Sequence, residues 1–206
     1  VPLEGRGRAA LASRSFHVGD VVFEEMPLLL VPRRSGDALC EALQRESGFD
    51  ASMWTAYFTC LELEAGAHAR VLRPFAPLGG PKAELWRRLL REREPSVREL
   101  LPSLDVEMFL QMNLVLAFNA IGCQLAKRDG SGPGADLGDG LFEFASCVNH
   151  SCRPNLSCWI KDGRGTLSAR AIRDVAEGEE LCFFYLDAAA LLAPRAARRS
   201  ELQEKY

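Results

Sequence analysis

The chain has 206 residues, 48% of them hydrophobic, which is enough to bury a core in one large domain. Its 25 basic and 28 acidic residues give a formal charge of -3, which excludes a polycationic surface for strong nonspecific binding of nucleic acid. The seven cysteines, an odd number without a Cys-x-x-Cys pair, argue against a secreted disulfide framework and indicate a reducing, intracellular compartment.

The sequence shows no charged-then-apolar leader, and its longest apolar stretch, residues 106–126, is interrupted by polar side chains that are costly in lipid. We therefore expect no membrane span. The chain begins with Val1 instead of Met, and this, together with the way it ends, suggests a fragment of a longer protein.

Strands are predicted first at residues 8–15 and 21–31, which are apolar and β-branched. Residues 17–20 supply Gly and Asp for the turn between them. Residues 171–183 repeat this order of strand, Gly-acid turn and strand. Because the pattern occurs only twice, it indicates a reused supersecondary unit and not a solenoid repeat.

From residue 37 to about residue 101, apolar residues recur at i, i+3 and i+4 and predict three helices. The residues are Leu39 and Leu43 in the first helix, Met53, Trp54, Tyr57, Phe58 and Leu61 in the second, and Leu85, Trp86, Leu89 and Leu90 in the third. A stretch rich in Pro and Gly, residues 74–81, separates the second helix from the third.

Residues 105–127 predict the longest helix, with Ser103 or Asp105 as its N-cap and Lys127 at its basic end. The helix is apolar nearly all round, so we expect it to be buried. A buried Asn119 then needs hydrogen-bond partners, since an unsatisfied amide is destabilising.

Five glycines in residues 129–140 predict a flexible loop, and this loop lacks the Lys-Ser/Thr of a phosphate-binding loop. Residues 155–161 and 166–173 predict two strands joined at an Asp-Gly turn, which is a strong hairpin signal. After a break at Pro194, the chain resumes as a short helix.

The densest group of polar and thiol side chains lies at residues 143–155, just before a strand-like run. In an extended chain the adjacent Asn149 and His150 would point to opposite faces, and in a tight turn their backbone groups would be open to a ligand. A second dense stretch, residues 177–187, contains an aromatic run that ends at Tyr185. We expect the two stretches to form one ligand site.

These stretches carry a resemblance to a known family. Asn-His-Ser-Cys-Arg-Pro-Asn at residues 149–155, followed by Gly-Glu-Glu-Leu at 178–181 and Phe-Tyr-Leu-Asp at 184–187, resembles the two signature segments of SET-domain protein-lysine methyltransferases. The Tyr-Leu-Asp ending is most similar to the SET-and-MYND (SMYD) subfamily. Further matches to that subfamily are Gly5-Arg6-Gly7, Asn119-Ala120 and residues 199–206.

The resemblance implies a mostly β SET fold of the α+β class, β-clip-like, with a knot-like crossing of the two segments and a helical insertion. It divides the chain into N-terminal strands at residues 1–35, the insertion at 36–104, the SET core at 105–187 and the start of a post-SET helix at 188–206. The subfamily carries its zinc-binding MYND module in the inserted region. Here that region holds only Cys40, Cys60 and His68, too few and too far apart for such a finger, so we expect the module to be missing.

Roles for single residues are also implied by the resemblance. Tyr185 would bring its phenol to the reacting centre, and Asn149 with the backbone of His150 would hold S-adenosylmethionine. The other implied residues are Arg6, Gly7 and Asn119 for the cofactor, Phe183 and Tyr206 for the lysine channel, and Cys152 for zinc if post-SET cysteines follow. Asn119 has a second interpretation, an amide satisfied by neighbouring backbone. The ring of Phe183 favours products beyond monomethyl-lysine.

The expected function is methylation of lysine on a histone or another protein, in the nucleus or the cytoplasm. The expected partner is thus a protein substrate, without direct nucleic-acid or membrane binding, and the chain is expected to be a monomer. Whether this chain is active without the post-SET cysteines stays open. Two alternatives also stay open: a catalytically silent SET module that binds cofactor or protein, and a hydrolase in which Cys147 or Cys152 acts with His150.

Overall fold

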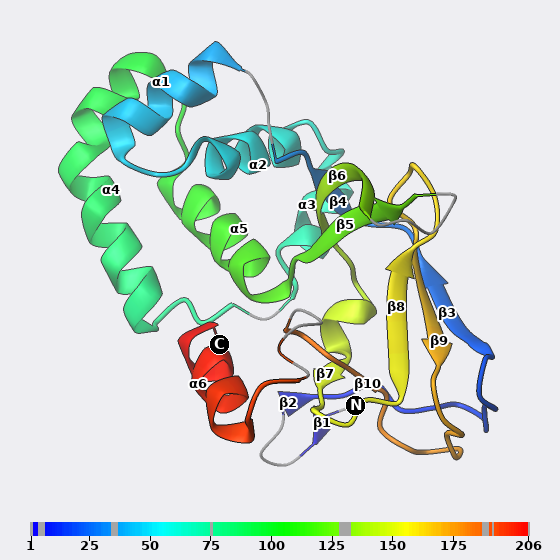
Figure 1. Cartoon of the computed structure of the whole chain (residues 1–206). Helices are drawn as coiled ribbons and strands as arrows, with labels where there is room; N and C mark the ends of the chain where they lie inside the picture. Colours follow the sequence, from blue (N-terminus) through cyan, green and yellow to red (C-terminus); the bar gives the residue numbers. More distant parts are fainter. Residues whose placement is uncertain are drawn as a thin grey trace. The chain divides into compact units, whose positions relative to one another are not determined.

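The structure, a computed structural model, describes residues 2–3, 7–33, 37–74, 76–127, 133–186, 190 and 192–205 (Figure 1). The chain forms two compact units, Val1–Met26 with Phe144–Tyr206, and Pro27–Glu143. Helices make up about 41% of the chain and strands about 23%. The predicted α+β class is confirmed, with helices taking the larger share.

Helices dominate the unit Pro27–Glu143 (Figure 1). They are α1 (Ala38–Ser47), α2 (Ala51–Leu61), α3 (Ala65–Val71), α4 (Pro81–Leu100) and α5 (Val106–Asn119). The three helices predicted from the i, i+3, i+4 spacing are confirmed as α1, α2 and α4, whereas the short α3 was not predicted. Carboxylates of Asp37, Asp50 and Asp105 accept backbone N–H groups at the starts of α1, α2 and α5, which confirms the Asp105 cap.

Aromatic side chains fill the core between these helices. The rings of Trp54 and Phe109 lie 4.2 Å apart between centroids, and both side chains are fully buried. The hydroxyl of Tyr57 accepts the backbone N–H of Asp105 at 3.0 Å, which ties α2 to the start of α5. Cys40 and Cys60 are buried members of the same core, so they act as small hydrophobic residues.

The prediction that one helix covers residues 105–127 was wrong in its second half. Helix α5 ends at Asn119, and Ile121–Ala126 forms strand β5. The apolar residues Ile121 and Cys123 alternate with Gly122 and a polar residue, which is the period of a strand. The longest helix among the described residues is α4, with 20 residues.

The predicted glycine-rich loop was also wrong for its described part. Strand β6 (Pro133–Leu141) pairs antiparallel with β5 and with β4 (Leu29–Val31). Gly138 has φ +112°, and a Cβ atom there would overlap the carbonyl of Val31. The glycines therefore permit close backbone pairing, and this role is not visible from composition.

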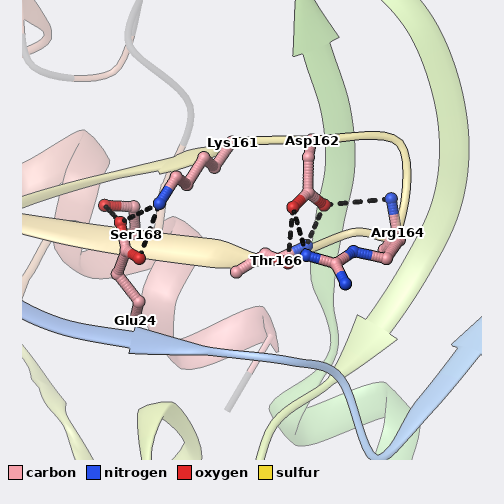
Figure 2. Close-up of polar contacts among 6 residues, drawn as sticks. All are labelled: Glu24, Lys161, Asp162, Arg164, Thr166 and Ser168. Atoms are coloured by element: carbon pink, nitrogen blue, oxygen red, sulfur yellow. Dashed lines mark hydrogen bonds and ion pairs between the residues drawn. The ribbon is translucent and has the colours of Figure 1, made fainter.

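A small antiparallel sheet of order β3-β9-β8 organises the other unit. Strands β8 (Leu156–Ile160) and β9 (Leu167–Ala171) confirm the predicted hairpin, and β3 (Val21–Glu25) pairs along β9. Figure 2 shows the turn, in which the carboxylate of Asp162 accepts the hydroxyl of Thr166 at 3.0 Å and nearby backbone N–H groups.

A second polar group in Figure 2 links β3, β9 and Lys161, the residue that follows β8. Glu24 on β3 accepts Lys161 Nζ at 2.7 Å and the hydroxyl of Ser168 at 3.2 Å. Ser168 is fully buried, so the contact satisfies a hydroxyl that would otherwise lie unpaired in the sheet.

The predicted strand at residues 8–15 was wrong beyond its first residue. Strand β2 covers Gly7–Arg8, where it pairs with β1 (Pro2–Leu3), and later residues form only isolated bridges, such as Leu11 with Glu180. The two copies of the repeated sequence pattern bond to each other. Ala12 N–H donates to the Glu179 carbonyl at 2.9 Å, and Gly178 N–H donates to the Ala12 carbonyl at 2.8 Å.

The last described element is α6 (Arg195–Lys205), the short helix predicted after Pro194. None of the helices in the described ranges combines the length and the apolar character that crossing a membrane requires.

We predict that Gly138→Ala destabilises the protein by roughly 2–5 kcal/mol, because it adds a side chain at a positive φ and against the Val31 carbonyl. Gly163→Ala is the matched control, since a Cβ at Gly163 meets nothing within 4 Å, and it should change stability by less than about 1 kcal/mol. Urea unfolding measures both. Equal stability of the two variants would contradict the account of β6.

Candidate active site

Two short strands bring the two motif segments together. Strand β7 (Asn149–His150) pairs in parallel with β10 (Cys182–Phe183), with Asn149 opposite Cys182 and His150 opposite Phe183. A single turn of 3₁₀-helix, η1 (Ala145–Cys147), leads into β7. The ladder continues beyond the strands, since Ser151 N–H donates to the Phe183 carbonyl at 3.1 Å. The expectation that the two stretches meet is confirmed.

The side chain of Asn155 links the segments that contain β7 and β10. Its Nδ2 donates to the Glu180 carbonyl at 2.8 Å and to Glu179 Oε1 at 3.2 Å, and its Oδ1 accepts the Cys182 N–H at 2.8 Å. Only 1% of Asn155 is exposed. A buried amide that uses both its donor and its acceptor groups across two segments fixes their register.

Glu179, one of the groups that Asn155 contacts, is held as a carboxylate. The guanidinium of Arg173, 2.6 Å away, and the Ala176 N–H lower the pKa of the Glu179 carboxyl. Its negative charge strengthens the hydrogen bond from Asn155.

Asn149 uses its side-chain donors inside the protein. Nδ2 donates to the Arg8 carbonyl at 3.0 Å and to Glu180 Oε1 at 2.9 Å. These two contacts fix the orientation of the amide, because only the nitrogen can donate. Its remaining polar atom, Oδ1, is an acceptor.

His150 has a defined tautomer. Nδ1 accepts the backbone N–H of Tyr185 at 3.1 Å, so the proton of the neutral ring is on Nε2, which lies 3.3 Å from Cys152 Sγ. Burial lowers the pKa of the imidazole, and the positive charge of Arg198 lowers it further, so the neutral ring is favoured.

This tautomer argues against the hydrolase alternative. A base for a Cys152 nucleophile would need a lone pair on Nε2, but that nitrogen carries the proton.

Tyr185 is fixed at three points. Its hydroxyl donates to the Val148 carbonyl at 2.7 Å, its backbone N–H donates to His150, and its ring lies 5.2 Å from that of Phe183 between centroids. The contact with Val148 fixes the direction of the phenolic proton.

These side chains line a cavity of about 610 Å³, a size that suits a small-molecule cofactor. Its walls are residues 149–152, Glu180, Cys182, Tyr185 and Leu202 of α6. Glu180 is the acidic residue among them, and its Oε1 accepts Asn149 Nδ2.

The other implied site residues lie as follows. Gly7 is in β2, and Cys152 is exposed beside His150. Asn119 is the last residue of α5, in the other unit, and is half-buried instead of fully buried. Its Nδ2 donates to the Val115 carbonyl at 2.7 Å. This is the kind of contact expected if the amide is satisfied by neighbouring backbone. Arg6 and Tyr206 lie outside the described residues.

No zinc site is formed by the part of the chain that the structure describes, since no three of its His, Cys, Asp and Glu side chains cluster in a way that could hold a metal ion. All seven cysteines are within that part, and each is a thiol.

Sequence reasoning gave no role to Asn155, Glu180 or Val148. Asn155 and Glu180 stand inside the two motifs, so their positions were a usable signal. The Val148 carbonyl gives no side-chain signal at all, because its part in the site is a backbone contact to the Tyr185 hydroxyl.

Asn149, His150 and Tyr185, which carry the resemblance in the two motifs, thus line one cavity. The family description "SET domain" matches residues 7–186, and the chain belongs to this family.

Among curated proteins, the chain is similar to the mouse protein-lysine N-trimethyltransferase SMYD5, with 39% identity over 69 residues, 34% of this chain and 17% of that protein. It is also similar to the mouse histone-lysine N-methyltransferase SMYD3, with 29% identity over 124 residues, 60% of this chain and 26% of that protein. The chain thus spans about a quarter or less of the length of these relatives. The solved SET domain of LSMT, bound to lysine and AdoHcy, matches with a TM-score of 0.43 and 13% identity over 91% of this chain and 49% of that chain.

We predict that Asn155→Ala destabilises the protein by roughly 2–4 kcal/mol, because it breaks the bonds of a buried amide and leaves the Cys182 N–H without its acceptor. Asn119→Ala is the control, since it removes an amide from another unit. Urea unfolding monitored by circular dichroism gives both free energies. A loss of less than about 0.5 kcal/mol in Asn155→Ala would show that the register does not depend on this side chain.

Proposed function

We propose that this chain is the catalytic SET domain of a protein-lysine methyltransferase that uses S-adenosylmethionine. The observation that carries the proposal is that Asn149, His150 and Tyr185, from two distant segments, line one cavity. Membership of the SET family supports it, as do the names of the relatives, which are protein-lysine and histone-lysine methyltransferases.

The chemistry of the cavity fits this cofactor. S-adenosylmethionine supplies a methyl group activated on a sulfonium, and it also carries an ammonium group. The Oδ1 acceptor of Asn149 suits the ammonium. The backbone of His150, together with Arg6, Gly7 and Asn119, completes the proposed set of cofactor contacts.

For the transfer itself, the protein has to hold a neutral lysine amine in line with the carbon–sulfur bond, since methyl transfer is a displacement at carbon. Burial beside a cation lowers the pKa of the incoming lysine and favours its neutral form. The hydroxyl of Tyr185, whose proton is directed at the Val148 carbonyl, would orient the amine or the methyl group.

Finer assignments are part of the same proposal. Phe183, whose ring lies beside that of Tyr185, would line the lysine channel with Tyr206 and leave room for an already methylated amine. Cys152 would bind zinc in a longer chain that supplies the post-SET cysteines. Residues 36–104 would be a helical insertion in a SET domain built from residues 1–35, 105–187 and 188–206.

The proposed partner is a protein with an accessible lysine, on a histone or elsewhere, bound by a monomer. A location in the nucleus or the cytoplasm agrees with the thiol form of all seven cysteines.

We predict that Tyr185→Phe binds S-adenosylmethionine within about threefold of the unchanged protein and loses turnover by a factor of about 100 or more. Calorimetry measures binding. Transfer of labelled methyl to histones and other proteins measures turnover, for this chain and for the full-length form of the protein. Phe184→Leu is the matched control, since it changes the neighbouring ring and keeps the phenol.

Two results would contradict the proposal. If the unchanged full-length protein binds the cofactor but transfers no methyl, the silent binding module is the better account. If neither binding nor transfer occurs, the cavity serves another ligand.

A further inference from the structure

Glu25, at the end of β3, reaches the beginning of the first motif segment from 119 residues away. Its Oε1 accepts the Phe144 N–H at 2.8 Å, and its Oε2 accepts the Ala145 N–H at 3.0 Å. Each carboxylate oxygen thus holds one of two consecutive backbone N–H groups. Bonds of this kind to a charged acceptor are stronger than those between neutral groups.

A ring contact lies beside these two bonds. Phe23, two residues before Glu25 on β3, packs edge-on against Phe144 with 4.8 Å between ring centroids. Ala145 is almost fully buried, although Phe144 is 41% exposed. Strand β3 therefore fixes this backbone by both a polar and an apolar contact.

The turn held by Glu25 ends at the carbonyl that binds the Tyr185 phenol. Within η1, Cys147 N–H donates to the Phe144 carbonyl at 2.8 Å, and Val148 N–H donates to the Ala145 carbonyl at 3.0 Å. Val148 has no exposed side-chain surface, and its carbonyl accepts the Tyr185 hydroxyl at 2.7 Å. One turn of 3₁₀-helix is all that separates Glu25 from the hydrogen-bond partner of the phenol.

We propose that Glu25 is a positioning residue for Tyr185, acting through η1 and the Val148 carbonyl. This inference rests on the proposed function, because positioning matters to turnover only if the phenol takes part in methyl transfer. A displacement reaction is sensitive to the placement of its groups, so a shift of the phenol of about 1 Å can lower the rate 100-fold.

Glu24 provides a matched control on the same strand. It carries the same carboxylate, but it contacts Lys161 and Ser168 in the β3-β9-β8 sheet and not the 144–148 segment (Figure 2). Glu24→Gln and Glu25→Gln therefore make the same chemical change on adjacent residues with different partners.

The experiment compares these two variants by ¹⁹F NMR of protein labelled with 3-fluorotyrosine, by amide hydrogen exchange and by turnover. The Tyr185 resonance is assigned by its loss in Tyr185→Phe. In Glu25→Gln we expect faster exchange at Phe144 and Ala145, a shifted Tyr185 resonance, and a kcat lower by a factor of about 10 to 100 with KM for the cofactor within about threefold. Glu24→Gln should leave all of these unchanged.

Glu25→Asp is a milder variant in case Glu25→Gln does not fold. It keeps the negative charge, but its side chain is one methylene too short to bind both N–H groups. It should shift the Tyr185 resonance and lower kcat by less than Glu25→Gln does. An unshifted Tyr185 resonance in both Glu25 variants, or the same effects in Glu24→Gln, overturns the inference. If the proposed function is wrong, the unchanged protein shows no turnover, which is a different result. The ¹⁹F and exchange measurements would still decide whether Glu25 positions Tyr185.

Discussion

The parallel pairing of β7 with β10, fastened by the buried amide of Asn155, is the constraint on which the site depends. It joins segments about 30 residues apart, and the side chains of Asn149, His150 and Tyr185 all form hydrogen bonds from one segment to the other. The tautomer of His150 and the direction of the Tyr185 hydroxyl depend on this pairing, since both contacts run from Tyr185 in the second segment to His150 or Val148 in the first. A shift of one residue in register would separate all of these partners.

The internal hydrogen bonds of the site determine what it can offer a ligand. The donors of Asn149 and Tyr185 are directed at carbonyl or carboxylate oxygens of the protein, and the Oδ1 of Asn149 is an acceptor. This acceptor agrees with the ammonium group of the cofactor that we propose.

Local signals in the sequence predicted local structure well. Apolar spacing gave α1, α2 and α4, and the Asp-Gly turn gave the β8-β9 hairpin. The prediction at β6 was wrong because a glycine-rich sequence is found both in flexible loops and where two backbones approach closely, as they do at Gly138. The residues at the cavity were predictable only through the joint motif, and the contact from Glu25 to Phe144, across 119 residues, leaves no local pattern.

Hydrogen exchange with and without S-adenosylmethionine tests the central claim, that the two paired segments form one cofactor site. We expect added cofactor to slow exchange at residues 149–152 and 180–185 together, because both segments line the same cavity. Protection confined to one segment, or found only in the α1–α4 region, would contradict the account even if the cofactor binds.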